Sequence, residues 1–242
     1  MSIARRRFWE AAAPVAEGGG FGIRLDGRPL RTPAGALLVV PSAGLAAAIA
    51  AEWDALDGEI RPERLPFTRA TNVAIDRVAP DPGPVVAAVA DYGGSDVLCY
   101  RAAGPAGLAE RQAAGWDPWL VWSARALDAP LVAVTGVMPT PQPAASLAAL
   151  RAAVAAEDAF GLTALHELVA LSGSLVLGLA VARGALAAPE AWALSRLDET
   201  WQAGQWGEDP EAEAAAAVRR ADFLRAAALK ALAAGERVAP IG

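Results

Sequence analysis

The sequence predicts an α+β protein, in which a small β-rich N-terminal domain is followed by a mainly α-helical C-terminal domain. Short alternations of apolar and polar residues, separated by glycine turns, occupy the start of the chain. Long segments with helical apolar spacing, bounded by glycine and proline, fill its second half. Apolar residues make up 55% of the 242 residues, which is enough for a sizeable core without disulfides. We place the two domains at residues 1–80 and 81–242.

The first predicted elements are three short strands. Phe21 to Leu25 alternates apolar and polar residues, and Asp26-Gly27 is typical of a tight hairpin turn. Residues 28–32 return along this hairpin, and residues 37–40 follow a second turn as the third strand. The start of the chain therefore predicts a small antiparallel sheet.

One helix follows the strands. Ser42 is a favoured N-cap residue, and the apolar side chains of Leu45, Ile49 and Trp53 recur at every fourth position after it. Gly58 marks the end of the helix. Because Trp53 lies on this apolar stripe, we assign it a structural role in helix packing rather than a role in partner binding.

Helices dominate the rest of the chain. Residues 61–71 contain two prolines and are expected to be extended or irregular. Asp117-Pro118 has the residue types of a cap and a first helical residue, so a helix is expected to restart there. Ser172-Gly173-Ser174 is expected inside a helix, where small residues let another helix pack closely. The four long helices predicted in the second half are Ala144–Phe160, Leu162–Arg183, Pro189–Gln205 and Pro210–Ala234.

Two short segments within the helical part have the composition of strands. Residues 96–101 and 131–137 are apolar runs, and the second is rich in β-branched residues and lies between two prolines. Either segment can pair back onto the N-terminal sheet, and the sequence leaves this open.

Composition and charge exclude several functions. The net charge of −6 argues against nucleic-acid binding, which needs a basic face. Cys99 is the only cysteine, so the chain has no internal disulfide and no thiolate metal cluster. Residues 168–182 form the longest apolar stretch, which is too short to cross a bilayer. The arginines at positions 5–7 precede no apolar run of the kind a secretory signal needs. We therefore expect a soluble, cytoplasmic protein that does not insert into membranes.

The sequence contains no recognisable catalytic or cofactor motif. His166 is the only histidine, and a zinc protease motif would need a second one where Ala170 stands. A phosphate-binding loop needs a lysine after its glycines, but the only lysine is Lys230 near the end. A histidine at the edge of the core is the simpler interpretation of His166, and a small hydrolase that uses His166 and Glu167 remains the alternative. We expect no cofactor and no metal.

Tryptophan is unusually frequent, with eight residues against two tyrosines. Large aromatic rings stabilise cores because each can bury 150–250 Å². Tryptophan is also enriched among the residues that dominate binding at protein interfaces. Composition favours the core for most of them and leaves a binding surface open.

An ordered series of short motifs runs almost from end to end of the chain. The series is Arg7-Phe8-Trp9, Leu25-Asp26-Gly27-Arg28-Pro29-Leu30-Arg31-Thr32-Pro33, Glu52-Trp53-Asp54, Pro66-Phe67-Thr68, Ala74-Ile75-Asp76-Arg77, Asp96-Val97-Leu98-Cys99-Tyr100-Arg101, Arg111-Gln112, Trp116-Asp117-Pro118, Gly173-Ser174, Leu197-Asp198-Glu199, Trp201-Gln202 and Trp206-Gly207-Glu208-Asp209. It resembles the family of assembly chaperones for the alpha subunit of the F-type ATP synthase, which is found in mitochondria and in alphaproteobacteria.

The resemblance implies a function that the residues alone do not give. It implies a chaperone without enzymatic activity, which binds the unassembled alpha subunit and assists assembly of the catalytic head. It also implies a bacterial cytoplasmic location, with the mitochondrial matrix as the location of eukaryotic relatives. A structural accessory subunit of the synthase is a further alternative.

The motifs of the resemblance are dense around one predicted helix, and we place the partner-binding site there. Asp198 and Gln202 are spaced as neighbours on a helix, as are Gln202 and Trp206, while Glu199 is offset by one residue. A helix face that combines an acid, an amide and a tryptophan is unfavourable in a protein core and typical of a protein–protein interface. The predicted partner-binding residues are therefore Asp198, Glu199, Gln202 and Trp206.

Overall fold

The computed structural model describes residues 6–207 and 209–238. Contacts within the chain group it into two compact units. The first unit extends to Pro82 and also includes Asp158–Ala164 and the residues from Ala228 on. The second unit consists of Gly83–Glu157 and Leu165–Ala227. The prediction of an α+β fold with an N-terminal sheet and a helical remainder is confirmed, while independent domains at 1–80 and 81–242 stay a prediction.

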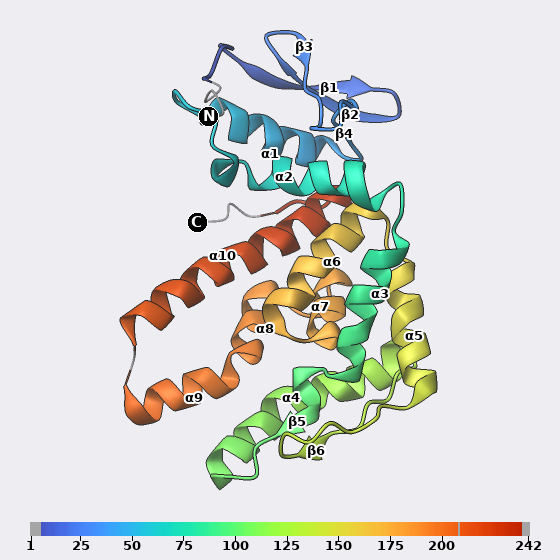
Figure 1. The fold of residues 1–242 in the computed structure, drawn as a ribbon, viewed down its shortest axis with the longest axis vertical. Coiled ribbons are helices and arrows are strands. Elements are labelled where there is room, and N and C mark those ends of the chain that lie inside the picture. The colour runs from blue at the N-terminus through green and yellow to red at the C-terminus, as the bar shows by residue number, and fades with distance from the viewer. Residues whose placement is uncertain (1–5, 208, 239–242) are drawn as a thin grey trace. The chain divides into compact units, whose positions relative to one another are not determined.

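The first unit is built on a small antiparallel sheet (Figure 1). Strands β1 (Ala12–Glu17) and β2 (Gly20–Leu25) form its main hairpin, and β2 also pairs with β3 (Arg28–Pro29) and β4 (Val39–Val40). The sequence predicts strands at β2, β3 and β4 but gives no indication of β1. This strand contains Pro14, which is depleted in strands and hides the pattern of an edge strand.

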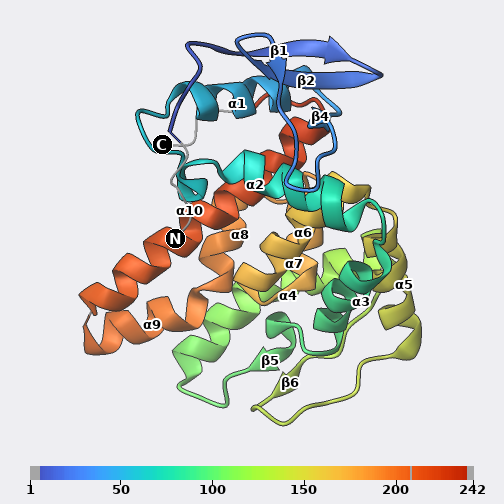
Figure 2. The same cartoon turned by 45° about the horizontal axis from the view of Figure 1, so that its top comes forward.

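Helix α1 (Ala43–Asp54) covers the sheet of the first unit, as Figure 2 shows. Ser42 caps it as predicted, because its hydroxyl oxygen accepts a hydrogen bond of 3.0 Å from Leu45 N. Leu45, Ile49 and Trp53 are all buried, so the predicted apolar stripe faces the core. Trp9 joins this core and meets Trp53 edge to face, with 5.1 Å between ring centroids.

The region expected to be irregular after α1 contains a helix. Helix α2 (Pro66–Val73) begins at a proline and continues into a single π-helical turn, Ala74–Val78. Its start is capped by the carboxylate of Glu52 in α1, which accepts from the backbone N–H groups of Phe67 at 2.5 Å and Thr68 at 2.9 Å. The prediction was wrong because this cap comes from another helix and leaves no local signal.

The second unit is a group of helices. Helices α3 (Gly83–Asp91), α4 (Ala106–Ala126), α5 (Ala144–Ala155), α7 (Leu175–Ala182), α8 (Ala188–Ser195) and α9 (Leu197–Trp206) lie in it, and α6 (Ala159–Ser172) and α10 (Pro210–Ala233) give residues to both units. Helix α4 runs without a break through Asp117-Pro118, so the predicted restart there is wrong. Asp117 pairs with Arg101 at 2.7 Å instead of capping, and Pro118 lies on the exposed side of α4.

The two strand-like segments within the helical part pair with each other rather than with the N-terminal sheet. Strands β5 (Tyr100–Arg101) and β6 (Val134–Thr135) form a parallel pair, which Figure 2 shows. Residues 97–99 form a turn of 3-10 helix instead of a strand. The predicted strands were therefore right in location but too long.

Two of the predicted long helices are each divided in two. Gly173 ends α6 with φ of +70°, and Ser174 caps α7, so Ser172-Gly173-Ser174 is a helix break and not the inside of a helix. Close packing between α6 and α7 depends on Gly178 of α7, where an added Cβ would lie 2.6 Å from Val169 Cγ2. The predicted helix 189–205 divides at Arg196 into α8 and α9.

The core of the second unit is formed by apolar side chains of the helices, including the fully buried Trp116, Leu168 and Phe223. Within the described residues, no helix is both long enough and apolar enough to pass through a bilayer.

Candidate partner-binding site

One side of α9 is held against α4. Leu197 is buried against Gly115 of α4. A Cβ added to Gly115 would lie 3.1 Å from Leu197 Cδ1. The ring of Trp201 lies against Gly107, where an added Cβ would lie 2.9 Å from Cη2. The guanidinium carbon of Arg111 is 5.1 Å from the Trp201 ring centroid, a cation–π distance. Leu197 and Trp201, one helical turn apart, therefore form the docked side of α9.

Asp198 is held on α4 as well. Its Oδ1 atom accepts a hydrogen bond of 2.7 Å from Nε2 of Gln112, a residue of α4 that is only 1% exposed. The other end of the same amide, Oε1, accepts from Ala102 N at 2.8 Å. Asp198 itself is partly buried. Gln112 thus links the segment before α4 to the first turn of α9.

The remaining predicted residues lie on the free side of α9. Glu199, Gln202 and Trp206 are exposed and are spaced three and four residues apart, so they share one face. Trp206 is 82% exposed, which is rare for so large an apolar ring. Glu199 pairs with Arg196 at 2.5 Å. We call Glu199, Gln202 and Trp206 the outer face of α9. The structure thus separates Asp198 from the other three predicted residues.

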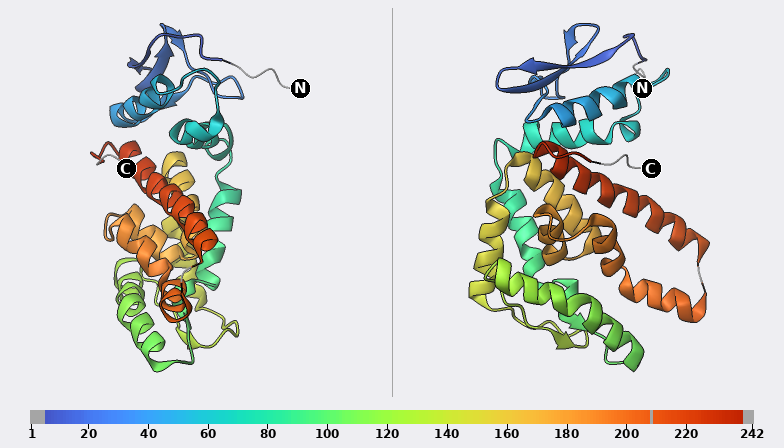
Figure 3. Two further views of the ribbon diagram at one scale, coloured as in Figure 1. Left: turned by 90° about the vertical axis from the view of Figure 1, so that its left-hand side faces the viewer. Right: turned by 180° about the vertical axis from the view of Figure 1, so that it is seen from behind.

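The start of α10 continues the exposed region along the chain. Figure 3 shows α9 leading into the beginning of α10. Residues 209–215 and 217–220 are exposed, and Val218 keeps 62% of its surface in contact with solvent. The alanine-rich composition of this half-helix gave no separate signal, because helix α1, whose apolar stripe is buried, is equally rich in alanine.

Trp53, the predicted structural residue, lies in the core of the first unit. It is buried, and its Nε1 donates a hydrogen bond of 3.0 Å to Thr68 Oγ1. Thr68 in turn donates its hydroxyl to Glu52 Oε2 at 2.8 Å. Trp53 therefore connects α1 to the start of α2.

The residues of the hydrolase alternative are neighbours on the exposed side of α6. His166 Nδ1 lies 3.9 Å from Glu167 Oε1, and the neighbouring carboxylate of Glu167 raises the pKa of His166. The hydroxyl of Ser172, further along α6, is engaged with Leu168 O at 2.7 Å. Among the described residues, no group of three or more His, Cys, Asp or Glu side chains could hold a metal ion.

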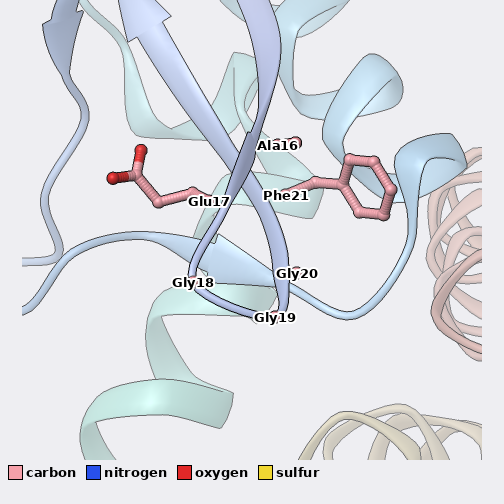
Figure 4. Close-up of a pocket in the computed structure, with 6 residues that line it drawn as sticks. All are labelled: Ala16, Glu17, Gly18, Gly19, Gly20 and Phe21. Carbon is pink, nitrogen blue, oxygen red and sulfur yellow. The ribbon is translucent and has the colours of Figure 1, made fainter.

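A shallow depression of about 430 Å³ lies at the glycine-rich turn of the β1–β2 hairpin (Figure 4). Glu17 and Phe21 point to opposite sides of the hairpin there. The carboxylate of Glu17 is already paired with Arg24 at 3.0 Å. The depression therefore lacks the converging polar groups of a small-molecule site.

Comparison with solved structures decides the family. The crystal structure of Atp12 from Paracoccus denitrificans matches with a TM-score of 0.90 and 51% identity, over 94% of this chain and 98% of that one. The chain belongs to the ATP12 chaperone family. The family model described as "ATP12 chaperone protein" matches residues 6–124. An aspartate-to-lysine variant of P. denitrificans Atp12p matches with the same TM-score, 50% identity, and coverage of 94% of this chain and 97% of that chain.

Two further proteins are similar to this chain. The Atu1473 protein of Agrobacterium tumefaciens matches with a TM-score of 0.87 and 42% identity, over 93% of this chain and 84% of that one. The mitochondrial protein atp12 of Schizosaccharomyces pombe is 42% identical over 74 residues, which are 29% of this chain and only a quarter of that protein. Membership of the ATP12 family supports the predicted class of function, an ATP synthase assembly chaperone, and agrees with the expectation that the chain is not an enzyme.

Proposed function

We propose that this chain is an assembly chaperone that binds the unassembled alpha subunit of the F-type ATP synthase in the bacterial cytoplasm, without enzymatic activity and without a cofactor. Membership of the ATP12 family supports the chaperone class. The motif series of the sequence supports the alpha subunit as the client. An unassembled subunit exposes apolar surface that its neighbour later covers, and such surface aggregates unless it is protected.

The outer face of α9 is the observation that carries this proposal. Trp206 is 82% exposed beside two polar side chains, Glu199 and Gln202. A solvent-facing tryptophan with polar neighbours has the composition of an interface, with an aromatic anchor and a polar rim. A helix face of this size gives separable contacts, which suits a chaperone that is displaced when the client is assembled.

Co-expression tests the proposal. We expect the alpha subunit to remain in the supernatant when it is produced with this chain and to aggregate when it is produced alone. His166→Ala is the control for the hydrolase alternative, because it removes the only histidine and leaves the outer face of α9 intact. Loss of a measurable turnover in His166→Ala would contradict the proposal, as would recovery of the chain in stoichiometric amounts from the finished synthase.

A further inference from the structure

The hydrogen bonds around Gln112 fix which chemical group Asp198 must provide. Ala102 N can only donate, so the atom of Gln112 that faces it is the acceptor Oε1. The atom that faces Asp198 is therefore Nε2, which can only donate. Position 198 must supply a hydrogen-bond acceptor, and its negative charge is not itself required by this contact.

From this geometry we propose that Asp198 is a positioning residue, which holds α9 on α4 through Gln112 so that the outer face of α9 is presented to the client. The proposal rests on the proposed function for its consequence in client binding. It removes Asp198 from the set of direct client contacts and leaves Glu199, Gln202 and Trp206 in that set.

Burial supports this role. Gln112 is almost completely buried, so a side chain at 198 without an acceptor would leave a buried N–H group without a partner. Lysine has only donors, so Asp198→Lys would set a donor against a donor. Asparagine keeps an acceptor oxygen of similar length and loses the charge. The two substitutions therefore separate the geometry of Asp198 from its charge.

The test compares Asp198→Asn, Asp198→Ala and Gln112→Met in the full chain, by hydrogen exchange of the α9 amides and by affinity for the purified alpha subunit. We expect Asp198→Asn to stay within about twofold of wild type in both measurements. We expect Asp198→Ala and Gln112→Met to speed α9 exchange, and to weaken binding, by about tenfold each, since each removes one partner of a hydrogen bond to a charged group. The double variant should be no worse than either single variant.

The opposite pattern would overturn the proposal: normal α9 exchange in Asp198→Ala, with Asp198→Asn losing binding as fully as Asp198→Ala. That result would make the charge of Asp198 a client contact. If Gln112→Met does not fold, the two Asp198 variants still decide between geometry and charge. If the wild-type chain does not bind the alpha subunit at all, the proposed function fails, and the exchange measurement alone still decides whether Asp198 positions α9.

Discussion

The buried carboxylate of Asp96 accepts a hydrogen bond of 3.1 Å from the hydroxyl of Ser174. The same oxygen accepts from Val176 N at 3.0 Å, and the other oxygen accepts from Leu98 N at 3.1 Å. Asp96 thus joins the segment before β5 to the capped start of α7. Asp96 and the Gly173-Ser174 pair both belong to the motif series, although both are far in sequence from the outer face of α9. Their hydrogen bonds give these motifs a structural role.

Asp96 makes the stability of the chain depend on pH. Burial raises the pKa of its carboxyl from 3.8 to about 6, and the hydrogen bonds from Val176, Leu98 and Ser174 only partly oppose this effect. The folded state therefore binds a proton that the unfolded state has released between about pH 4 and pH 6, so this stability is lost as the pH rises through that window. Burial also raises the pKa of the neighbouring Cys99 to about 12, so Cys99 does not titrate there.

Asp96→Asn tests this dependence, because asparagine does not titrate. We expect the free energy of unfolding of wild type, minus that of Asp96→Asn, to fall by a few kcal/mol at most as the pH is raised from about 4 to about 6. Denaturant unfolding at several pH values measures this difference. A difference that stays constant, or that rises with pH, would contradict the role of Asp96.

Trp53 is expected to be important for stability and not for binding. Trp53→Ala removes a buried ring and the partner of Thr68 Oγ1, so it should cost about 3–5 kcal/mol of unfolding free energy. Phe8→Ala is a matched control, because Phe8 is 64% exposed and its removal should cost less than about 1 kcal/mol. A Trp53→Ala variant with normal stability and lost alpha-subunit binding would show that Trp53 contacts the client instead of stabilising the core.

Gly178 is expected to tolerate no larger side chain. A Cβ at this position would lie 2.6 Å from Val169 Cγ2 and 3.3 Å from Leu165 Cδ1, so Gly178→Ala should destabilise the chain by about 1–3 kcal/mol. Gly204 of α9 has open space around it, and Gly204→Ala should be neutral or stabilising by up to about 1 kcal/mol. Equal melting temperatures for the two variants would show that α6 and α7 adjust at no cost.

Glu199 offers the cleanest test of charge on the outer face of α9. Its exposed side chain pairs only with Arg196 among the ion pairs of the described residues, so Glu199→Lys should leave the melting temperature close to that of wild type. We expect the same variant to weaken binding of the alpha subunit. Unchanged affinity in Glu199→Lys would move the client site away from this part of the face.

The sequence was most informative where structure depends on neighbouring residues. Three features were predicted from residues close together in the chain: the Ser42 cap, the apolar stripe that contains Trp53, and the Asp26-Gly27 turn. The wrong predictions concern elements whose structure is determined by residues far away in the sequence. Glu52 caps α2 from another helix, and the two strand-like segments pair with each other instead of with the N-terminal sheet.

The same distinction holds for the candidate site. Helical spacing placed Gln202 and Trp206 together, and the structure leaves both exposed. Spacing could not show that Asp198 is held by Gln112, because 86 residues separate the two in the chain. Composition alone did not indicate the exposure of Trp206, since it favours burial for most tryptophans.

Titration calorimetry of the purified chain with the unassembled alpha subunit, compared between wild type and Trp206→Ala, measures directly whether the outer face of α9 holds the client. We expect a one-to-one complex whose dissociation constant rises at least about thirtyfold in Trp206→Ala, which is the loss of about 2 kcal/mol expected at an interface hot spot. The exposed aromatic control Phe8→Ala should bind like wild type. Absence of a complex with the wild-type chain, or equal affinity of Trp206→Ala and wild type, would contradict the claim that this chain holds the alpha subunit through the outer face of α9.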